Sequence, residues 1–217
     1  MSDSNIIATD KGQVPAEPRP ARLIVTLAIA GLISGFAIVG IYEATFDTIA
    51  ANRLRELREA VFTVLPGITS MQEYVYRDGA LVKTDKAGSD ELSVYAGYDK
   101  QGSFFGYAIP GEGPGFQDTI VLLYGYKPDT RKLTGMQVLD SRETPGLGDK
   151  ITKDHNFIDQ FARLAVDPII KLVKGGARAP NEVDAITGAT ISSRAVVKIL
   201  NNTDGVWLNK LPPEPPR

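Results

Sequence analysis

A run of 20 residues without a charged side chain, residues 23–42, limits most strongly what this chain can fold into. A helix needs about 20 apolar residues to cross the hydrocarbon core of a bilayer. A cleaved signal peptide would have a shorter apolar region behind a compact basic start. Residues 1–22 instead contain three prolines and charges of both signs. We therefore predict an uncleaved transmembrane helix over residues 23–42.

The orientation of this helix follows only weakly from charge. Three basic residues stand on each side of the span: Lys11, Arg19 and Arg22 before it, and Arg53, Arg55 and Arg58 after it. The immediate flanks, Arg22 against Glu43 and Asp47, favour a cytoplasmic segment over residues 1–22. Gly31 and Gly35 form a G-x-x-x-G pattern, which lets another helix approach closely but also arises by chance. The span holds no Asp, Glu, His, Lys or Arg, so it offers no charged group that could relay protons or bind an ion within the membrane.

Residues 43–67 are predicted to continue as an amphipathic helix that joins the anchor to a domain. Apolar residues recur there at three- and four-residue spacing, at Leu54, Leu57, Val61 and Val64. Pro66 and Gly67 predict the end of this helix.

Residues 68–208 change to short extended runs separated by turn residues. Three hairpins are predicted, over residues 74–83, 92–109 and 119–139. A glycine-rich connection is expected over residues 110–116, and a helix over residues 156–173. The prediction is an α+β domain with a mainly antiparallel sheet flanked by helices. A proline-rich tail, residues 209–217, is expected to be extended and solvated.

Composition excludes several kinds of site. The chain of 217 residues has no cysteine, so it has no cysteine-ligated iron–sulfur cluster, attached haem or disulfide. His155 is the single histidine, which excludes a multi-histidine metal site, and no metal is expected. A net charge of −2 argues against a nucleic-acid surface.

The segment Asp-Ala-Ile-Thr-Gly-Ala-Thr-Ile-Ser-Ser, residues 184–193, is rich in hydroxyl groups and opens onto a helix. Apolar residues follow at helical spacing, at Ile191, Ala195, Val196, Ile199 and Leu200, which places Thr190 at or just before a helix N-terminus. Unpaired N–H groups and a partial positive charge at that end suit a phosphate. A simpler interpretation, that Thr190 or Ser192 only caps the helix, fits the segment equally well.

The pattern Asp-x-x-Thr-Gly-Ala-Thr within this segment resembles the flavinylation motif of FMN-binding domains in the G subunit of Rnf electron-transport complexes. The C subunit of the sodium-pumping NADH:quinone reductase carries a similar motif. In that family the last threonine carries FMN through a phosphoester bond installed by a dedicated flavin transferase. The resemblance implies that this residue is Thr190, with Thr187, Gly188, Ala189 and Ser193 also in the cofactor site. Asp184 would serve mainly in recognition by the transferase.

A second segment, Glu143-Thr144-Pro145-Gly146-Leu147-Gly148, resembles the flavin-side loop of the same domains. Taken alone it fits an ordinary Pro-Gly turn. The resemblance implies instead that backbone N–H groups and the Leu147 side chain face the flavin ring. The cofactor-binding residues of this loop would be Glu143, Thr144, Gly146, Leu147 and Gly148.

The function implied by the resemblance is electron transfer through one covalent FMN in an Rnf complex, which couples electron flow between ferredoxin and NAD⁺ to ion movement. No catalytic residue and no substrate chemistry are expected in this chain. Expected partners are the other Rnf subunits, a flavin transferase and membrane lipid, with the flavin domain on the extracytoplasmic side of the inner membrane. Two alternatives stay open: the flavin-bearing C subunit of the sodium pump, and an anchored assembly module without a cofactor.

Overall fold

The computed structural model describes residues 20–84 and 91–216, and most of the predicted cytoplasmic segment lies outside these residues. The chain divides into two compact units, Met1–Ala51 and Asn52–Arg217, which are described separately. In the first unit, helix α1 (Pro20–Val64) begins and contains the predicted span without a break. By length and composition this helix could cross a membrane, and none of its apolar window is buried. Beyond the predicted span, the same helix continues as far as Val64.

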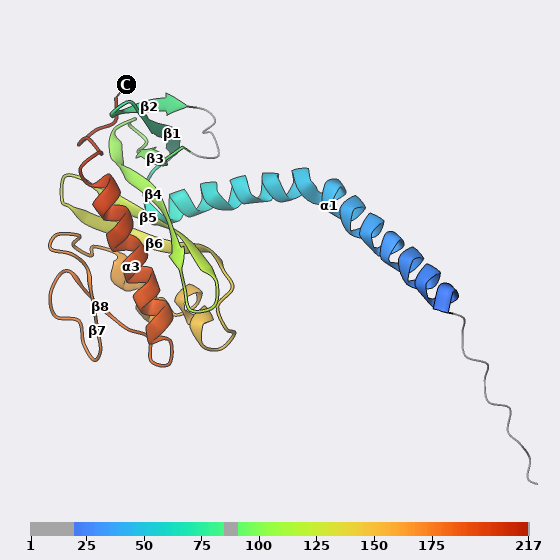
Figure 1. The fold of residues 1–217 in the computed structure, drawn as a ribbon. Coiled ribbons are helices and arrows are strands. Elements are labelled where there is room, and N and C mark those ends of the chain that lie inside the picture. The colour runs from blue at the N-terminus through green and yellow to red at the C-terminus, as the bar shows by residue number, and fades with distance from the viewer. Residues whose placement is uncertain (1–19, 85–90, 217) are drawn as a thin grey trace, which may run out of the picture. The chain divides into compact units, whose positions relative to one another are not determined.

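The second unit is built on a six-stranded antiparallel sheet (Figure 1). Its strands are β1 (Ser70–Arg77), β2 (Ala80–Thr84), β3 (Ser93–Tyr98), β4 (Phe104–Pro114), β5 (Thr119–Lys127) and β6 (Lys132–Ser141). The order across the sheet is β2-β1-β3-β4-β5-β6. Strands consecutive in sequence are therefore neighbours in the sheet, except β2 and β3, between which β1 lies. The predicted antiparallel α+β domain is thus confirmed.

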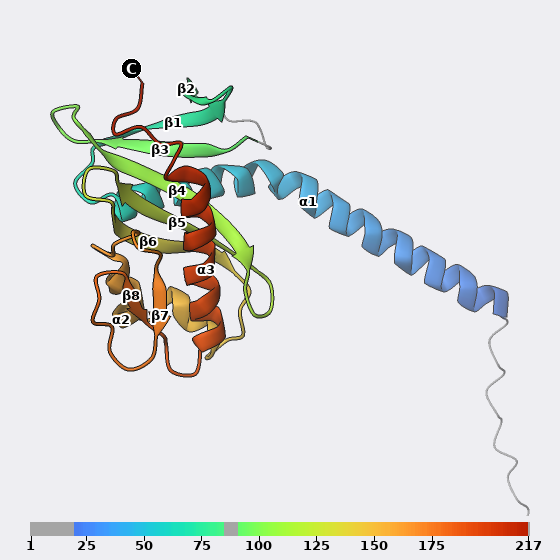
Figure 2. The same ribbon diagram turned by 60° about the vertical axis from the view of Figure 1, so that its left-hand side comes forward.

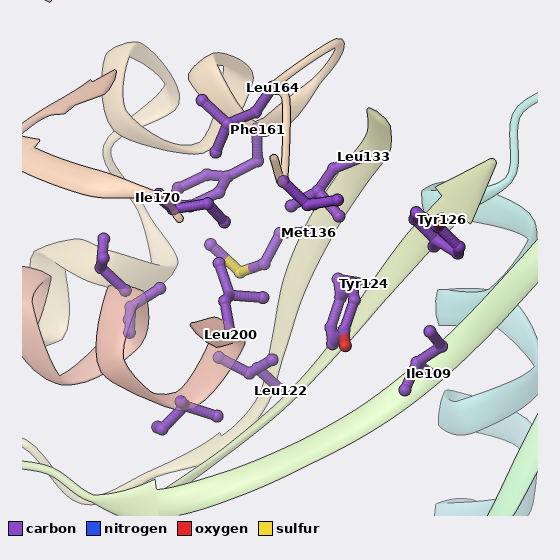
Figure 3. Close-up of a cluster of buried hydrophobic side chains, with 14 of the residues drawn as sticks. Ile109, Leu122, Tyr124, Tyr126, Leu133, Met136, Phe161, Leu164, Ile170 and Leu200 are labelled. Atoms are coloured by element: carbon purple, nitrogen blue, oxygen red, sulfur yellow. The ribbon is translucent and has the colours of Figure 1, made fainter. Parts of the chain in front are cut away.

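Side chains alternate between the two faces of the sheet, as the two-residue period of a strand requires. Tyr107, Ile109, Leu122 and Tyr124 belong to one buried cluster, which Figure 3 shows in part. That cluster also holds the apolar side of α3 (Thr190–Trp207), which crosses the face of the sheet in Figure 2.

On the other face, residues between those side chains meet the end of α1. Ala108 and Leu123 pack with Ala60, Val61 and Val64 in a separate buried cluster. The Thr134 hydroxyl donates a hydrogen bond to the Val64 carbonyl at the last residue of the helix. Both faces of the sheet are therefore covered by helices.

Most of the glycine-rich segment, residues 110–114, is part of a strand, and only residues 115 and 116 lie in the connection to the next strand. Strand β4 continues to Pro114, and Gly111 and Gly113 pair with β5. A Cβ at Gly113 would lie 2.8 Å from Ile199 Cγ1 in α3, and one at Gly111 would lie 2.8 Å from the Thr203 hydroxyl. These glycines let α3 lie close against the sheet.

The helix expected over residues 156–173 is wrong. The structure has short turns of helix, η1 (Gly148–Thr152), α2 (His155–Ile158) and η2 (Asp159–Phe161), and then β7 (Lys171–Val173), which pairs in parallel with β8 (Glu182–Asp184). Phe157 and Phe161 give the helical spacing and are buried, but Pro168 cannot continue a helix. The intervening backbone instead pairs with β6, where the Leu133 N–H donates to the Leu164 carbonyl at 2.8 Å.

The proline-rich tail is held against the domain, contrary to the expectation that it is solvated. The Tyr107 hydroxyl donates to the Pro212 carbonyl and the Tyr74 hydroxyl to the Pro216 carbonyl, each at 3.1 Å. Pro215 is buried. The sequence could not show this, because the tyrosine hydroxyls that hold the tail lie more than 100 residues away in the chain.

Candidate functional site

A tight turn leads the chain from β8 into α3 and presents Thr190. Gly188 has a φ of +84°, a backbone geometry that glycine adopts without strain. The Ala189 N–H donates to the Ile186 carbonyl at 3.0 Å, which closes the turn. Ala189 is the N-cap of α3, and Thr190 is its first helical residue.

The hydroxyl groups of this turn have different roles. The Ser193 hydroxyl is fully buried; it donates to the Ala189 carbonyl at 2.9 Å and accepts the Ile186 N–H at 3.2 Å. Ser193 therefore braces the turn from inside. The alternative that Thr190 caps the helix does not hold, since no side chain caps α3. Among the described residues, no hydrogen-bond partner of the Thr190 hydroxyl is found, and its half-buried side chain faces a cavity.

Glu143 is a buried carboxylate that ties three segments together at this cavity. The residue is only 5 % exposed. Oε1 accepts the Phe116 N–H at 2.8 Å and the Gln117 N–H at 3.0 Å, while Oε2 accepts a hydrogen bond from the Ser192 hydroxyl in α3. Burial by itself raises the pKa of this carboxyl, but the bonds from Ser192 and the two N–H groups outweigh it and hold the pKa below its usual value.

The loop that follows Glu143 is a turn closed by its own backbone. The Leu147 and Asp149 N–H groups both donate to the Thr144 carbonyl, at 3.1 and 3.3 Å. The Leu147 N–H is therefore already paired, contrary to the expectation that bare N–H groups of this loop face a ligand. The Leu147 side chain can still face a ligand, because it is 52 % exposed.

A cavity of about 340 Å³ lies between this loop and the start of α3. It is lined by Phe116, Glu143, Thr144, Leu147, Gly148, Gly188, Ala189, Thr190, Ile191 and Ser192. The structure thus brings both predicted segments to one site. Gly146 and Ser193 are not among its lining residues, nor is Thr187.

Three large apolar side chains stand exposed around this cavity. Phe116, Leu147 and Ile191 are 64 %, 52 % and 56 % exposed. We call these three residues the apolar rim. The sequence analysis did not assign Phe116 or Ile191 to the site: Phe116 is the last residue of the glycine-rich segment, and Ile191 was counted with the apolar residues of the helix. Only the long-range contact between the 115–118 turn and Glu143 brings Phe116 to the site.

Thr187 lines a second cavity of about 330 Å³, together with Lys150, Asp154, Gln160 and Asp184. Asp184 has a structural role there, because its carboxylate accepts the Gly176 and Ala177 N–H groups at 2.7 and 2.8 Å. These bonds, with that of Ala177 the larger, lower the pKa of the Asp184 carboxyl. Asp184 therefore orders the turn before β8.

Residues 115–203 match the family of FMN-binding domains. Over 181 residues the chain is 33 % identical to the G subunit of the ion-translocating oxidoreductase complex of Methanosarcina acetivorans, covering 83 % of this chain and 90 % of that protein. The chain belongs to this G-subunit family. A second G subunit of such a complex, from Aliivibrio fischeri, is 32 % identical over 82 % of this chain and 85 % of its own length.

Another relative in the G-subunit family is named for sodium and for its reaction partners. It is the G subunit of the Na⁺-translocating ferredoxin:NAD⁺ oxidoreductase complex of Acetobacterium woodii, with 28 % identity over 87 % of this chain and 91 % of that protein.

Solved structures share the fold of this member of the G-subunit family. NqrC of Shewanella oneidensis aligns with a TM-score of 0.61 over 73 % of this chain and 97 % of that chain, at 18 % identity. The C subunit of the Na⁺-translocating NADH-quinone reductase of Parabacteroides distasonis aligns with a TM-score of 0.51 at 20 % identity, covering 65 % of this chain and 76 % of its own. At these identities the likeness concerns the fold.

The cavity of this G-subunit family member fits a flavin mononucleotide. Its volume falls within the range of about 300–1,000 Å³ that is usual for small-ligand sites. An apolar rim suits a flat aromatic ring, and the first turn of α3 suits a phosphate. Gly148 lets the loop pack closely against Glu143 and α3 at the base of the cavity. A Cβ at this position would lie 2.5 Å from Glu143 Oε2 and 2.7 Å from the Ser192 hydroxyl.

Proposed function

We propose that this chain carries electrons for an Rnf complex through an FMN joined to Thr190 by a phosphoester bond. The observation that carries the proposal is the Thr190 side chain itself. It stands at the first position of α3, takes no part in capping the helix, and lines the cavity that the FMN-binding family match spans. In such a bond Thr190 Oγ1 loses its proton and replaces one oxygen substituent on the phosphorus, which leaves, so the chain gains the mass of FMN less one water.

The residues around Thr190 hold the phosphate and the ring in different ways. The unpaired N–H groups of the first turn of α3 and the positive end of the helix dipole stabilise a phosphate at this position. Phe116, Leu147 and Ile191 shield part of the ring from water, and the turn around Gly188 keeps the approach to Thr190 open. When bound, FMN supplies the redox chemistry, and the domain supplies attachment and orientation.

The residue roles follow the two segments predicted to touch the cofactor. Thr187, Gly188 and Ala189 set the turn, and Ser193 braces it. Thr144 lines the cavity and donates its hydroxyl proton to Gln117 Oε1 at 3.0 Å, which fixes the two sides of the cavity. Gly146, with a φ of +77°, lets the loop present Leu147.

An Rnf complex is favoured over the sodium-pumping NADH:quinone reductase as the setting of this chain. The sequence relatives are G subunits at 33 % and 32 % identity, whereas the likeness to C-subunit structures is at 18–20 %. A cofactor-free assembly module has less support, because the FMN-binding family match covers both motifs. The partners would be the other subunits of the complex, a flavin transferase during maturation, and lipid around α1.

The test is intact mass and in-gel flavin fluorescence of the full chain, co-expressed with a flavin transferase. We expect a denaturation-resistant adduct of FMN less one water on the wild type and none on Thr190→Ala. Thr130→Ala is the matched control, since Thr130 lies in the exposed turn between β5 and β6. It should keep the full adduct.

Each other outcome points to a different conclusion. A wild-type chain without an adduct would contradict covalent attachment and favour the assembly module. An adduct that survives in Thr190→Ala would move the attachment to another hydroxyl, which fragmentation of the labelled peptide would locate.

A further inference from the structure

Glu143 is the ionisable side chain among the described residues that line the Thr190 cavity. We propose that its carboxylate acts as a fixed negative charge at the base of this cavity and lowers the reduction potential of the FMN held there. This inference rests on the proposed function, because it needs the flavin in the cavity. It adds a quantity that the protein controls, the potential at which the cofactor is half reduced.

The carboxylate is fixed in place by hydrogen bonds from two other segments of the domain. The turn at residues 116–117 supplies two N–H groups, the first turn of α3 supplies the Ser192 hydroxyl, and the Glu143 backbone begins the loop that carries Leu147. A side chain held at both oxygens cannot swing out to water when charge in the cavity changes. Its electrostatic effect on a bound ring is therefore preorganised.

No ion pair to this carboxylate is found in the described part of the chain. Arg142, next in sequence, points to Asp118 at 3.6 Å, and its side chain is 78 % exposed. Lys150 lines the second cavity with Thr187, and its Nζ lies 3.9 Å from where a Cβ on Gly188 would stand, but it forms no ion pair with Glu143. The bonds from Ser192, Gln117 and Phe116 keep the pKa of Glu143 low despite burial, so the group is ionised at neutral pH.

The bonding of the two oxygens also shows how Glu143 acts. Oε1 accepts two N–H groups and Oε2 accepts the Ser192 hydroxyl, so neither oxygen carries a proton to give. A role as proton donor to the ring would require breaking one of these bonds. The geometry thus points to an effect of charge.

The sign of the effect follows from electrostatics. Reduction of a flavin by an external reductant adds electrons, and each electron that no proton accompanies adds one negative charge. A buried carboxylate at the wall of the cavity raises the energy of that added charge, because a site sheltered from water screens it poorly. The reduced form is disfavoured, and the potential falls.

The decisive variant is Glu143→Gln, because it removes the charge and can keep all three bonds. The Gln amide oxygen can accept the Phe116 and Gln117 N–H groups, as Oε1 does now. Its NH₂ group can donate to the Ser192 hydroxyl oxygen, since a hydroxyl both donates and accepts. In the variant, only the direction of the hydrogen bond between residue 143 and the Ser192 hydroxyl is reversed.

The measurement is a spectroelectrochemical titration, with dithionite as reductant, of the detergent-solubilised full chain co-expressed with the transferase. At the potential where the wild type is half reduced, we expect Glu143→Gln to show about a tenfold higher ratio of reduced to oxidised flavin. For a two-electron couple this corresponds to about 30 mV.

Two further variants separate charge from structure. Glu112→Gln removes one formal charge from an exposed residue of β4 and should leave the potential unchanged. Ser192→Ala removes one hydrogen bond but keeps the carboxylate, and should change the ratio by less than threefold. A shift in Ser192→Ala as large as in Glu143→Gln would overturn the inference, because position and not charge would then set the potential.

Adduct mass, measured first on every sample, distinguishes failure of the inference from failure of the proposed function. A wild type without flavin overturns both. Fully flavinylated Glu143→Gln with the wild-type potential overturns the inference alone. A Glu143→Gln chain that folds, by its circular dichroism and unfolding temperature, yet takes no flavin also overturns it, since Glu143 would then serve attachment. If Glu143→Gln does not fold, the Ser192→Ala potential decides.

Discussion

Asp204 and Tyr124 form a polar pair inside the apolar layer between α3 and the sheet. Asp204 is 4 % exposed, and its Oδ1 accepts the Tyr124 hydroxyl at 2.8 Å. Oδ2 has no hydrogen-bond partner in the described residues. Burial raises the pKa of Asp204 to about 6, and the Tyr124 bond offsets only part of this.

This pair predicts a pH dependence of stability that runs against that of ordinary carboxylates. The pKa of Asp204 is about 6 in the folded chain and 3.8 in the unfolded chain. Between these pH values the folded chain therefore binds the Asp204 proton more tightly than the unfolded chain does. Its contribution to stability is complete below pH 4 and is lost as the pH rises to 6, a change of roughly 2–3 kcal/mol.

Asp204→Asn should remove this change, since the amide keeps an oxygen for Tyr124 and does not ionise. Unfolding free energies at pH 4.5 and 7.5 should show the variant gaining on the wild type as the pH rises. Asp159→Asn, at an exposed position, is the control and should run parallel to the wild type. Parallel curves for Asp204→Asn would contradict the assignment.

Gly148 allows a second prediction about a single residue. Gly148→Ala would place a Cβ 2.5 Å from Glu143 Oε2 and 2.7 Å from the Ser192 hydroxyl, and so separate the loop from α3. We expect flavin attachment to fall at least tenfold and stability to fall by about 1–3 kcal/mol. In-gel fluorescence and denaturant unfolding measure the two effects.

The matched control is Gly205→Ala, because a Cβ at Gly205 meets nothing within 4 Å. It lies within α3, where replacing glycine with alanine should stabilise the helix by about 0.5–1 kcal/mol. Its flavin content should equal that of the wild type. Equal flavin content in Gly148→Ala would show that the close packing at the base of the cavity is not required.

At the scale of the element, local patterns were sufficient for strands β1 to β6, the anchor helix and α3, but they did not indicate the short strands β7 and β8. Each of these predicted elements shows a regular spacing of apolar residues bounded by a turn, and the structure has each element near its predicted position. The same reasoning placed a helix over 156–173, because the Phe157–Phe161 spacing is helical and both rings face the core. What ends that helix is pairing of residues 163–165 with β6, a contact that no local window contains.

The candidate site, too, could be predicted from the sequence only in part. The sequence indicated Thr190 and the Glu143 loop through their motifs, but it did not indicate Phe116 or Ile191. It also gave no sign that Glu143 would accept hydrogen bonds from two distant segments, the turn at residues 116–117 and α3. Such long-range hydrogen bonds depend on the closed sheet and therefore need the three-dimensional structure.

Contact between β4 and α3 predicts an energetic coupling between two elements. Gly113→Ala places a Cβ 2.8 Å from Ile199 Cγ1, which should destabilise by about 1–3 kcal/mol. Ile199→Ala, at a buried position, should cost about 2–5 kcal/mol. In the double variant the smaller side chain makes room for the new Cβ.

A double-mutant cycle of unfolding free energies measures this coupling. We expect the double variant to be at least about 1 kcal/mol more stable than the two single changes would give by addition. Strict additivity would show that α3 shifts away from β4 when crowded. Val82→Ala, at an exposed position of β2, should be additive with either change.

For the whole molecule, we propose that the flavin domain lies outside the cytoplasm. The chain has no cysteine, so single cysteines can report the side of the membrane without background. Lys100→Cys, in the exposed turn between β3 and β4, should react with a membrane-impermeant maleimide in intact cells. Asp10→Cys should react only after lysis, and the reverse pattern would invert the proposed topology.

The position of α3 as the last helix has a consequence for how this protein is completed. Strands β3 to β6 can pair one after another as they leave the ribosome, because neighbours in the sheet are neighbours in sequence. The Thr190 cavity instead needs residues 116, 143 and 147 already in place when residues 188–192 arrive. Flavin attachment would then require the completely folded domain, and the fluorescent fraction of a preparation would measure the fraction of chains that had folded.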